Sequence, residues 1–322
     1  MLTDKHKAER LGFVKSFLRR GHGDTVHWHD MLDTVHIDEK WFYISKVNRR
    51  YYLWNDEPVP MRKCQSKRHL MKVMFLTAVA RPRFDAHRRK SWDGKIGTWP
   101  FTMVRPALRN SKNFKRGDAI TEPVVVTKEV YRSFLVDKVI PAIKSRWPGR
   151  RSKTIWVQQD SARPHVAVDD APVLAAGQSD GWDIRLCAQP SQSPDMNVLD
   201  LGLFNAIQSL QHHTASYTIE ELVLAVSKAY DDLDPLVLDK TFMTLQKVME
   251  CVLKMDGDNV YKIPHANKDK LLKNGPLCQR VQCDEETYAA IEAMEERIDF
   301  VQSVDNVIQQ FQSTCEIHDS MI

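Results

Sequence analysis

Residues 34–42 read Thr-Val-His-Ile-Asp-Glu-Lys-Trp-Phe, an apolar, β-branched run that carries Asp38. Residues 155–165, Ile-Trp-Val-Gln-Gln-Asp-Ser-Ala-Arg-Pro-His, end a second such run on Asp160. Residues 193–204, Ser-Pro-Asp-Met-Asn-Val-Leu-Asp-Leu-Gly-Leu-Phe, place Asp200 in an amphipathic helical pattern. Carboxylates gathered without a balancing basic residue repel one another, and divalent cations relieve that repulsion. The three segments therefore predict a metal site suited to phosphodiester chemistry.

The sequence around these aspartates alternates between strand-like and helix-like patterns. Short apolar runs predict strands at 35–37, 41–44, 51–54, 72–80, 154–159 and 183–187, with a hairpin turn at 48–50. Helical spacing predicts helices from Thr127 to Trp147, near 168–176 and at 194–212. Strands followed by a helix–strand alternation predict an α/β fold, with a mixed sheet flanked by helices on both faces.

Three parts of the chain follow from this pattern. Residues 1–30 hold a linker-like helix over 1–20 and then a Gly-rich break, and 31–215 form the α/β domain. Residues 216–322 form an α-helical C-terminal region that starts at a capping box and contains no strand. About residues 81–122 lose all periodicity and are too long for a simple connection, so they are expected to be an insertion that is functional or mobile. The apolar stripe of the last segment is more typical of packing on its own domain than of a partner-binding helix.

Composition limits the class of protein. With 43% hydrophobic and 27% charged residues the chain is ordinary for a globular protein, and 322 residues allow about two domains. It has no uninterrupted apolar stretch of about 18 residues, which predicts no membrane span. The charged first twenty residues lack the apolar core of a secretory signal. Six scattered cysteines have no zinc-ligand spacing, so a reduced intracellular protein is expected.

The net charge of +4 conceals a strongly basic segment at residues 46–95. A basic segment beside a metal site suits a polyanionic substrate such as DNA, because neutralising phosphates drives binding. A solvated surface explains the charge alone about equally well. The candidate nucleic-acid contacts are Arg62, Lys63, Lys67, Arg68 and Lys72 in this segment, with Arg163 and His165 after the second aspartate.

Hydrolysis or transfer at phosphorus asks for two cations about 3.5–4 Å apart, held mainly by carboxylates. Asp38, Asp160 and Asp200 supply these if the first two strands are adjacent and the helix crosses their ends. Asp195 is expected to be a first-turn or capping residue, and Glu39 a neighbour of the ligands. A zinc site at the histidines lacks ligand spacing, and a serine hydrolase lacks the glycine pattern around its nucleophile, so both are disfavoured.

The strings HIDEKWFY, QQDSARPH and QPSQSPDMNVLDLG resemble the three catalytic blocks of mariner-like transposases. The match is best to the branch with 39 residues between the second and third aspartates, the length of 161–199 here. The resemblance covers most of residues 1–215. It implies an RNase H-like core that uses Mg²⁺ or Mn²⁺, with Asp38, Asp160 and Asp200 as metal ligands. Such enzymes act as nuclear dimers that cut at terminal inverted repeats and join the freed 3′ ends to target DNA, typically at TA.

The chain also departs from the family pattern. Ser161 stands where Asn is usual and Arg163 where Lys is usual, and Ala167-Val168 replace His/Pro character. None of these changes removes an expected metal ligand, although Ser161 adjoins one. The family's N-terminal helix-turn-helix pair is not found before the catalytic blocks. The alternative to an active transposase is therefore a truncated or domesticated transposase-derived DNA-binding protein without catalytic activity.

Overall fold

A computed structural model describes residues 2–22, 25–44, 54, 56–57, 71–110, 114–149, 153–263, 275 and 277–296. Two compact units divide the chain. One is Met31–Leu245, and the other joins Met1–Asp30 with Gln246–Ile322. The boundary between Leu245 and Gln246 falls inside helix α7 (Pro235–Lys254). Residues 216–245 therefore belong to the same unit as the sheet and not to a separate C-terminal part.

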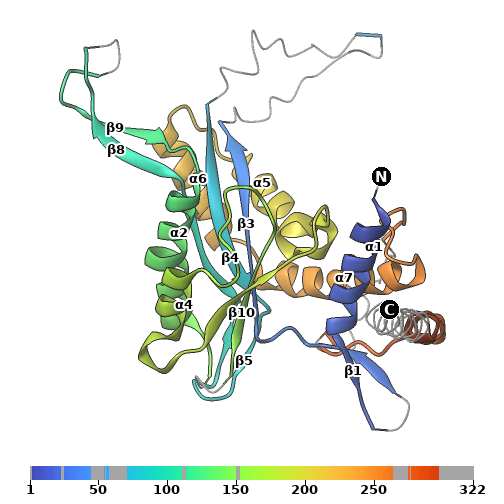
Figure 1. Cartoon of the computed structure of the whole chain (residues 1–322). Helices are drawn as coiled ribbons and strands as arrows, with labels where there is room; N and C mark the ends of the chain where they lie inside the picture. Colours follow the sequence, from blue (N-terminus) through green and yellow to red (C-terminus); the bar gives the residue numbers. More distant parts are fainter. Residues whose placement is uncertain are drawn as a thin grey trace, which may run out of the picture. The chain divides into compact units, whose positions relative to one another are not determined.

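The first of these units is built on a five-stranded mixed sheet with the order β11-β10-β3-β4-β7 (Figure 1). Its strands are β3 (Thr34–Tyr43), β4 (Lys72–Ala80), β7 (Lys95–Pro100), β10 (Ile155–Gln159) and β11 (Ile184–Ala188). β10 runs parallel to β3 and β11, whereas β3, β4 and β7 are antiparallel. The two strands expected at 35–37 and 41–44 are one continuous strand. The turn expected at 48–50 and residues 51–53 lie outside the described residues.

Helices cover both faces of the sheet, as the sequence predicts (Figure 1). On one face lie α2 (Lys128–Phe134), the π-helical η2 (Leu135–Val139), α3 (Ile140–Arg146) and α4 (Ala171–Gln178). On the other lie η5 (Leu199–Leu203, also π-helical), α5 (Phe204–Gln211) and α6 (Ile219–Asp231). Successive side chains of a strand point to opposite faces. Ile37 therefore joins the core under α2, whereas Phe42 packs edge-on against Phe204 with ring centroids 6.4 Å apart.

Residues 81–122, where the sequence shows no periodicity, contain regular structure. β5 (Arg83–Asp85) and β6 (Lys90–Trp92) form one hairpin, and β8 (Thr102–Pro106) and β9 (Ala119–Pro123) form another. Between them β7 completes the edge of the main sheet. These strands have three to six residues each, which is too short for a clear alternation of apolar and polar positions.

The second unit begins with α1 (Asp4–Ser16), which is shorter than the helix expected over 1–20. After it, β1 (Leu18–Arg20) and β2 (Val26–Trp28) pair as a hairpin. The unit also contains the end of α7 and a helical stretch at residues 285–296.

The predicted capping box of α6 is confirmed, with Glu221 N donating to Thr218 Oγ1 over 3.2 Å. Beyond it, the described residues form no strand other than a single bridge of Gln282 with His27. None of the described helices has both the length and the apolar character needed to cross a lipid bilayer.

Candidate active site

The three predicted aspartates line one pocket of about 290 Å³. Asp38 lies within β3, and the pairing of Gln158 with His36 brings the end of β10 level with it, so Asp160 follows at the same height. Asp200 lies in η5, which packs on β3. The wall of the pocket is completed by Ser161, Ala162 and the loop Gln189, Pro190, Ser191, Gln192, Ser193 and Pro194.

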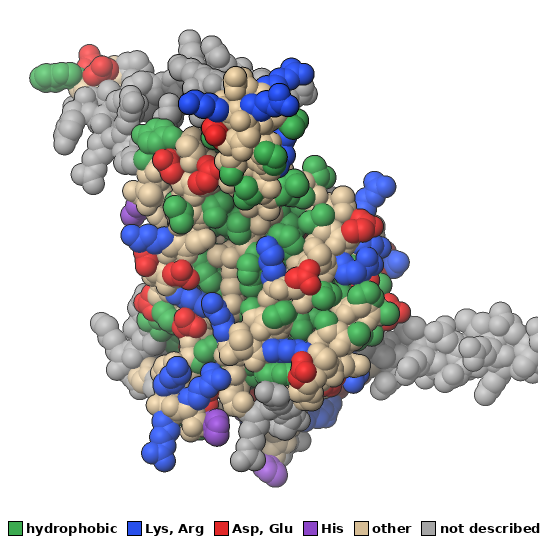
Figure 2. All heavy atoms as spheres, turned by 90° about the vertical axis from the view of Figure 1, so that its left-hand side faces the viewer, with side chains coloured by type: hydrophobic (Ala, Val, Ile, Leu, Met, Phe, Trp, Pro, Cys, Tyr) green, Lys and Arg blue, Asp and Glu red, His purple; other side chains and the backbone are tan. Residues whose placement is uncertain are grey.

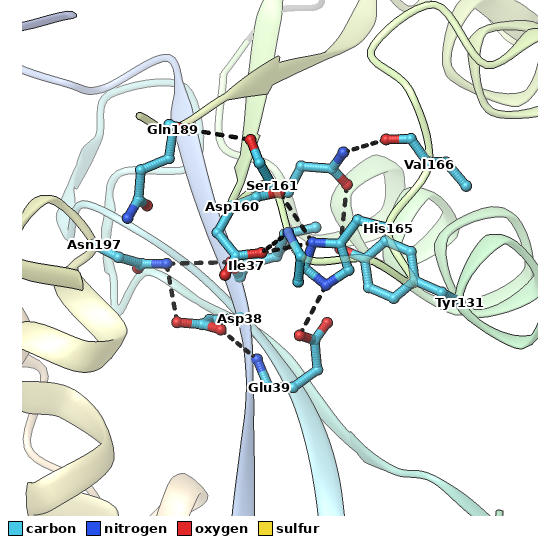
Figure 3. Close-up of polar contacts among 12 residues, drawn as sticks. Ile37, Asp38, Glu39, Tyr131, Asp160, Ser161, His165, Val166, Gln189 and Asn197 are labelled. Atoms are coloured by element: carbon cyan, nitrogen blue, oxygen red, sulfur yellow. Dashed lines mark hydrogen bonds and ion pairs between the residues drawn. The ribbon is translucent and has the colours of Figure 1, made fainter. Parts of the chain in front are cut away.

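Asp38 is the most enclosed of the three, with 9% of its surface exposed. Its Oδ1 accepts a hydrogen bond from the backbone N–H of Glu39 over 2.7 Å, and its Oδ2 accepts one from Asn197 Nδ2 over 3.2 Å (Figure 3). Burial, then the charges of Asp200 and Glu39, raise the pKa of Asp38 to about 9. These effects favour the protonated form of this carboxyl when no cation is bound.

Asp200 shares a hydrogen bond with Asp38. Burial raises the pKa of Asp200, although the hydrogen bond with Asp38 and the charge of Lys40 act in the opposite direction. Two carboxyl groups that share one proton in a confined place form the arrangement that a divalent cation stabilises, since the cation replaces the proton as the balancing charge.

Asp160 is held differently, by His165. Its Oδ1 lies 2.7 Å from His165 Nδ1 and accepts the backbone N–H of Ala162 over 2.9 Å. The pKa of Asp160 is lowered, first by the hydrogen bond with His165. On its other side His165 Nε2 lies 3.0 Å from Glu39 Oε2, so one imidazole bridges two carboxylates (Figure 3).

The imidazole of His165 is buried and charged. Its ring stacks on Tyr131 with centroids 4.2 Å apart and an interplanar angle of 15°. Burial lowers the pKa of His165, but the hydrogen bonds with Asp160 and Glu39 outweigh it and raise the value to about 10. The structure thus places His165, a candidate DNA contact by sequence, between two carboxylates of the protein.

Glu39, Tyr131 and Asn197 are residues whose part in the site was missed or understated from the sequence. Asn197 donates to Asp38 and accepts the N–H of Leu199 over 3.0 Å, which ties the helix bearing Asp200 to β3. The hydroxyl of Tyr131 donates to Gln159 Oε1 over 3.2 Å. The Gln158-Gln159 pair in the sequence could have indicated such partners, because two amide side chains at the end of an apolar strand need buried hydrogen-bond partners.

The donor set fits Mg²⁺ or Mn²⁺, which prefer carboxylate oxygens. In the part of the chain that the structure describes, no three His, Cys, Asp or Glu side chains are gathered as a complete ion site. Asp38 and Asp200 bind each other, while Asp160 binds His165. Two observations therefore support a divalent cation here. The three aspartates line one pocket, and a cation would remove the repulsion between the carboxylates of Asp38 and Asp200.

The remaining site predictions fall in different places. Arg62, Lys63, Lys67 and Arg68 lie outside the described residues. Lys72 is exposed at the start of β4, with its Nζ 4.0 Å from the centroid of the Trp41 ring, and Arg163 is exposed beside the pocket. Asp195 occupies the first turn of a short 3₁₀ helix, η4 (Pro194–Met196), the position expected for it.

Comparison with known proteins gives structural matches only. No protein-family model matches the chain, and no curated protein sequence matches it significantly. Among solved structures, a Mos1 transposase paired-end complex with the left transposon end is similar at TM-score 0.54 and 15% identity, covering 80% of this chain and 64% of that one. A pre-cleavage Mos1 transpososome reaches TM-score 0.56 at 14% identity, covering 81% and 65%. The Mos1 transposase catalytic domain with Raltegravir and Mn gives 0.51 at 15%, covering 81% and 99%.

These matches establish the fold. The chain shares the α/β architecture of the Mos1 catalytic domain, so the prediction of an RNase H-like core is confirmed. The similar structures belong to a mariner transposase, the group that the sequence motifs resemble. This chain spans about two thirds of the Mos1 chain in the DNA complexes, and nearly all of the isolated catalytic domain.

Proposed function

We propose that this protein is a mariner-type transposase catalytic core, a metal-dependent enzyme that cleaves and transfers DNA strands. The observation that carries the proposal is the meeting of Asp38, Asp160 and Asp200, each from a different segment, at one pocket. The raised pKa of Asp38 adds to it, because strongly perturbed carboxyls in a pocket are typical of functional sites. The fold shared with the Mos1 catalytic domain supports the same assignment.

In this proposal the three aspartates hold Mg²⁺ or Mn²⁺, two ions in all. When bound, the ions lower the pKa of an attacking hydroxyl and balance charge at the phosphorus. The chain's own residues prepare the site. Asn197 fixes Asp38 relative to the helix of Asp200, and His165, held by Glu39, orients Asp160. The buried side of the pocket excludes water from Asp38, which strengthens its interaction with any cation.

The finer parts of the function extend the proposal. The expected reaction is hydrolytic cleavage at terminal inverted repeats, followed by attack of the freed 3′-hydroxyl on target DNA at TA. Structures similar to this chain include Mos1 paired-end complexes with Mn or Mg, which supports DNA and divalent ions as ligands. A homodimer acting in the nucleus completes the assignment, carried over from the family that the motifs resemble.

The test is whether the protein nicks supercoiled plasmid DNA in the presence of Mn²⁺ or Mg²⁺. A concentration of about 5 mM is chosen so that weak sites are also occupied. Wild type should nick the plasmid, and Asp38→Asn and Asp200→Asn should each abolish nicking. Asp169→Asn is the matched control, because Asp169 is an exposed aspartate outside the pocket and should not affect the reaction.

Two results would overturn the proposal. Nicking that persists at the wild-type rate in Asp200→Asn would show that the pocket is not the active site. DNA binding by wild type without any nicking, together with no Mn²⁺ binding by calorimetry, would favour the DNA-binding alternative that lacks catalytic activity.

A further inference from the structure

The β8–β9 hairpin extends from the end of the sheet that carries the aspartates. The end of β7, Pro100, pairs with Phe75 of β4, and Phe75 pairs with Lys40, two residues beyond Asp38 on β3. The β5–β6 hairpin follows Ala80 at the other end of β4, level with Val35. Figure 1 shows the two hairpins at opposite ends of the sheet. Of the two hairpins, β8–β9 therefore lies at the end of the sheet towards which β3 runs beyond Asp38.

The base of this hairpin is held firmly on the domain. Phe101, just before β8, stacks on Phe134 of α2 with ring centroids 4.2 Å apart. Arg105 of β8 and Glu122 of β9 form a two-pronged ion pair at 2.5 and 2.7 Å. Thr121 of β9 hydrogen-bonds Glu220 at the start of α6. These contacts fix the base of the hairpin on the domain.

Among the described residues, the tip of the hairpin carries more positive than negative charge. Arg109, Lys115 and Arg116 are exposed, and within the described residues their side chains form no ion pair or hydrogen bond. The nearby Asp118 accepts the backbone N–H of Lys115 over 2.7 Å, and Glu122 is occupied by Arg105. Figure 2 shows Lys and Arg side chains grouped at the top of the face on which this hairpin lies.

We propose that the β8–β9 hairpin is a DNA-binding arm, in which Arg109, Lys115 and Arg116 contact the phosphate backbone outside the pocket. This rests on the proposed function, since it takes DNA as the substrate. Three exposed cations at one tip, beside a single carboxylate, match a polyanion. A second copy of the chain is the weaker fit. Met103 and Val104 are adjacent in β8 and so point to opposite faces of the hairpin, and the other exposed apolar residues, Leu108 and Phe114, are next to Arg109 and Lys115 in the chain.

The experiment is the salt dependence of binding to a duplex DNA of arbitrary sequence, followed by fluorescence anisotropy. Each phosphate contact contributes about 0.9 to the slope of log affinity against log salt, so Arg109→Gln/Lys115→Gln/Arg116→Gln should reduce the slope by about 2.7. Between 50 and 200 mM salt, a range on the order of that used for such titrations, wild type should lose about 40-fold more affinity than the variant.

Two matched variants separate charge from side effects. Arg89→Gln/Lys90→Gln removes two exposed charges from the β5–β6 hairpin at the other end of the sheet and should leave the slope unchanged. Arg109→Lys/Arg116→Lys keeps the charge and should keep the slope. The tip side chains are exposed and form no ion pair or hydrogen bond with the described residues, so the melting temperature should be unaffected.

The outcomes distinguish this inference from the proposed function. A wild type that nicks DNA, with an unchanged slope in the tip variant, would overturn the arm alone. A tip variant that changes sedimentation but not the slope would assign the hairpin to self-association instead. A wild type that neither binds nor nicks DNA would overturn both proposals.

Discussion

Asp38→Asn tests whether the central carboxyl is protonated in the metal-free protein. Burial and Asp200 raise the pKa of Asp38 from its ordinary 3.8 to about 9. A carboxyl with a raised folded pKa contributes most to stability below pH 3.8, and the contribution is lost as the pH rises towards 9. Without divalent ions, the free energy of unfolding of wild type should therefore fall over this range.

The size of the effect follows from proton uptake. At pH 7 the pH lies about 3 units above the pKa of the carboxyl in the unfolded chain. Folding must then add a proton to Asp38, and at about 1.4 kcal/mol per unit this lowers the free energy of unfolding by at most about 4 kcal/mol. The asparagine amide nitrogen cannot accept the hydrogen bond from Asn197, which offsets about 1 kcal/mol of the gain. Asp38→Asn should thus stabilise the protein by about 1–3 kcal/mol at pH 7, and not at pH 4.

The assay is thermal unfolding in EDTA, from pH 4 to pH 8.5. For a domain of this size we expect a rise in melting temperature of about 2–4 °C per kcal/mol. Asp169→Asn, at an exposed position outside the pocket, is the control and should change the melting temperature little. Added Mn²⁺ should raise the melting temperature of wild type more than that of Asp38→Asn. If Asp38→Asn lowers the melting temperature equally at pH 4 and pH 8.5, the carboxyl is ionised and the reasoning fails.

His165→Gln should lower the melting temperature more at pH 6 than at pH 10, because the charged imidazole stabilises the fold fully below its ordinary pKa of 6.5 and less as the pH rises through about 10. Equal effects at both pH values would contradict a charged ring. Tyr131→Phe should cost about 1 kcal/mol in urea unfolding, since Gln159 Oε1 loses its donor; no loss would mean that the oxygen finds another. Gly177→Ala should cost about 1–3 kcal/mol, because its Cβ would lie 2.3 Å from a carbonyl oxygen of β11. Gly202→Ala, where nothing is nearer than 3.4 Å, should be neutral or stabilising, and equal values for both glycines would refute the close packing.

Four of the five strands of the central sheet could be predicted because they carry continuous apolar runs. β4 has the expected bounds of Lys72–Ala80, and β10 and β11 differ by a residue at their ends. The short strands of residues 81–122 could not be predicted in this way. Their pairing depends on partners and turns, such as β7 joining β4, and Pro, Gly, Lys and Arg interrupt any apolar run in this part of the sequence.

The sequence predicts that the three aspartates lie close together, but it does not predict that the pKa of Asp38 is raised and that of Asp160 lowered. The sequence places Asp38 and Asp160 at comparable strand positions, and nothing local shows that one is protonated and the other ion-paired. That difference comes from His165, which reaches Glu39 across 126 residues of chain, and from the burial of Asp38. Distant partners and solvent exclusion are properties of the folded domain.

The π-helical turn at Leu199–Leu203 links the number of residues in this helix to the way Asp200 is presented to the pocket. A π turn holds one residue more than the α turn that it replaces, so this helix contains the equivalent of a single-residue insertion. Asp200 lies within the turn, and the buried Phe204 follows it. Deleting one residue between them would restore α geometry with little rotation of the flanking segments, because a π turn and an α turn each complete about one revolution. Phe204 should therefore keep its place in the core, while the wide turn that presents Asp200 to the pocket is lost, so a deletion of one codon here should affect the chemistry more than the folding.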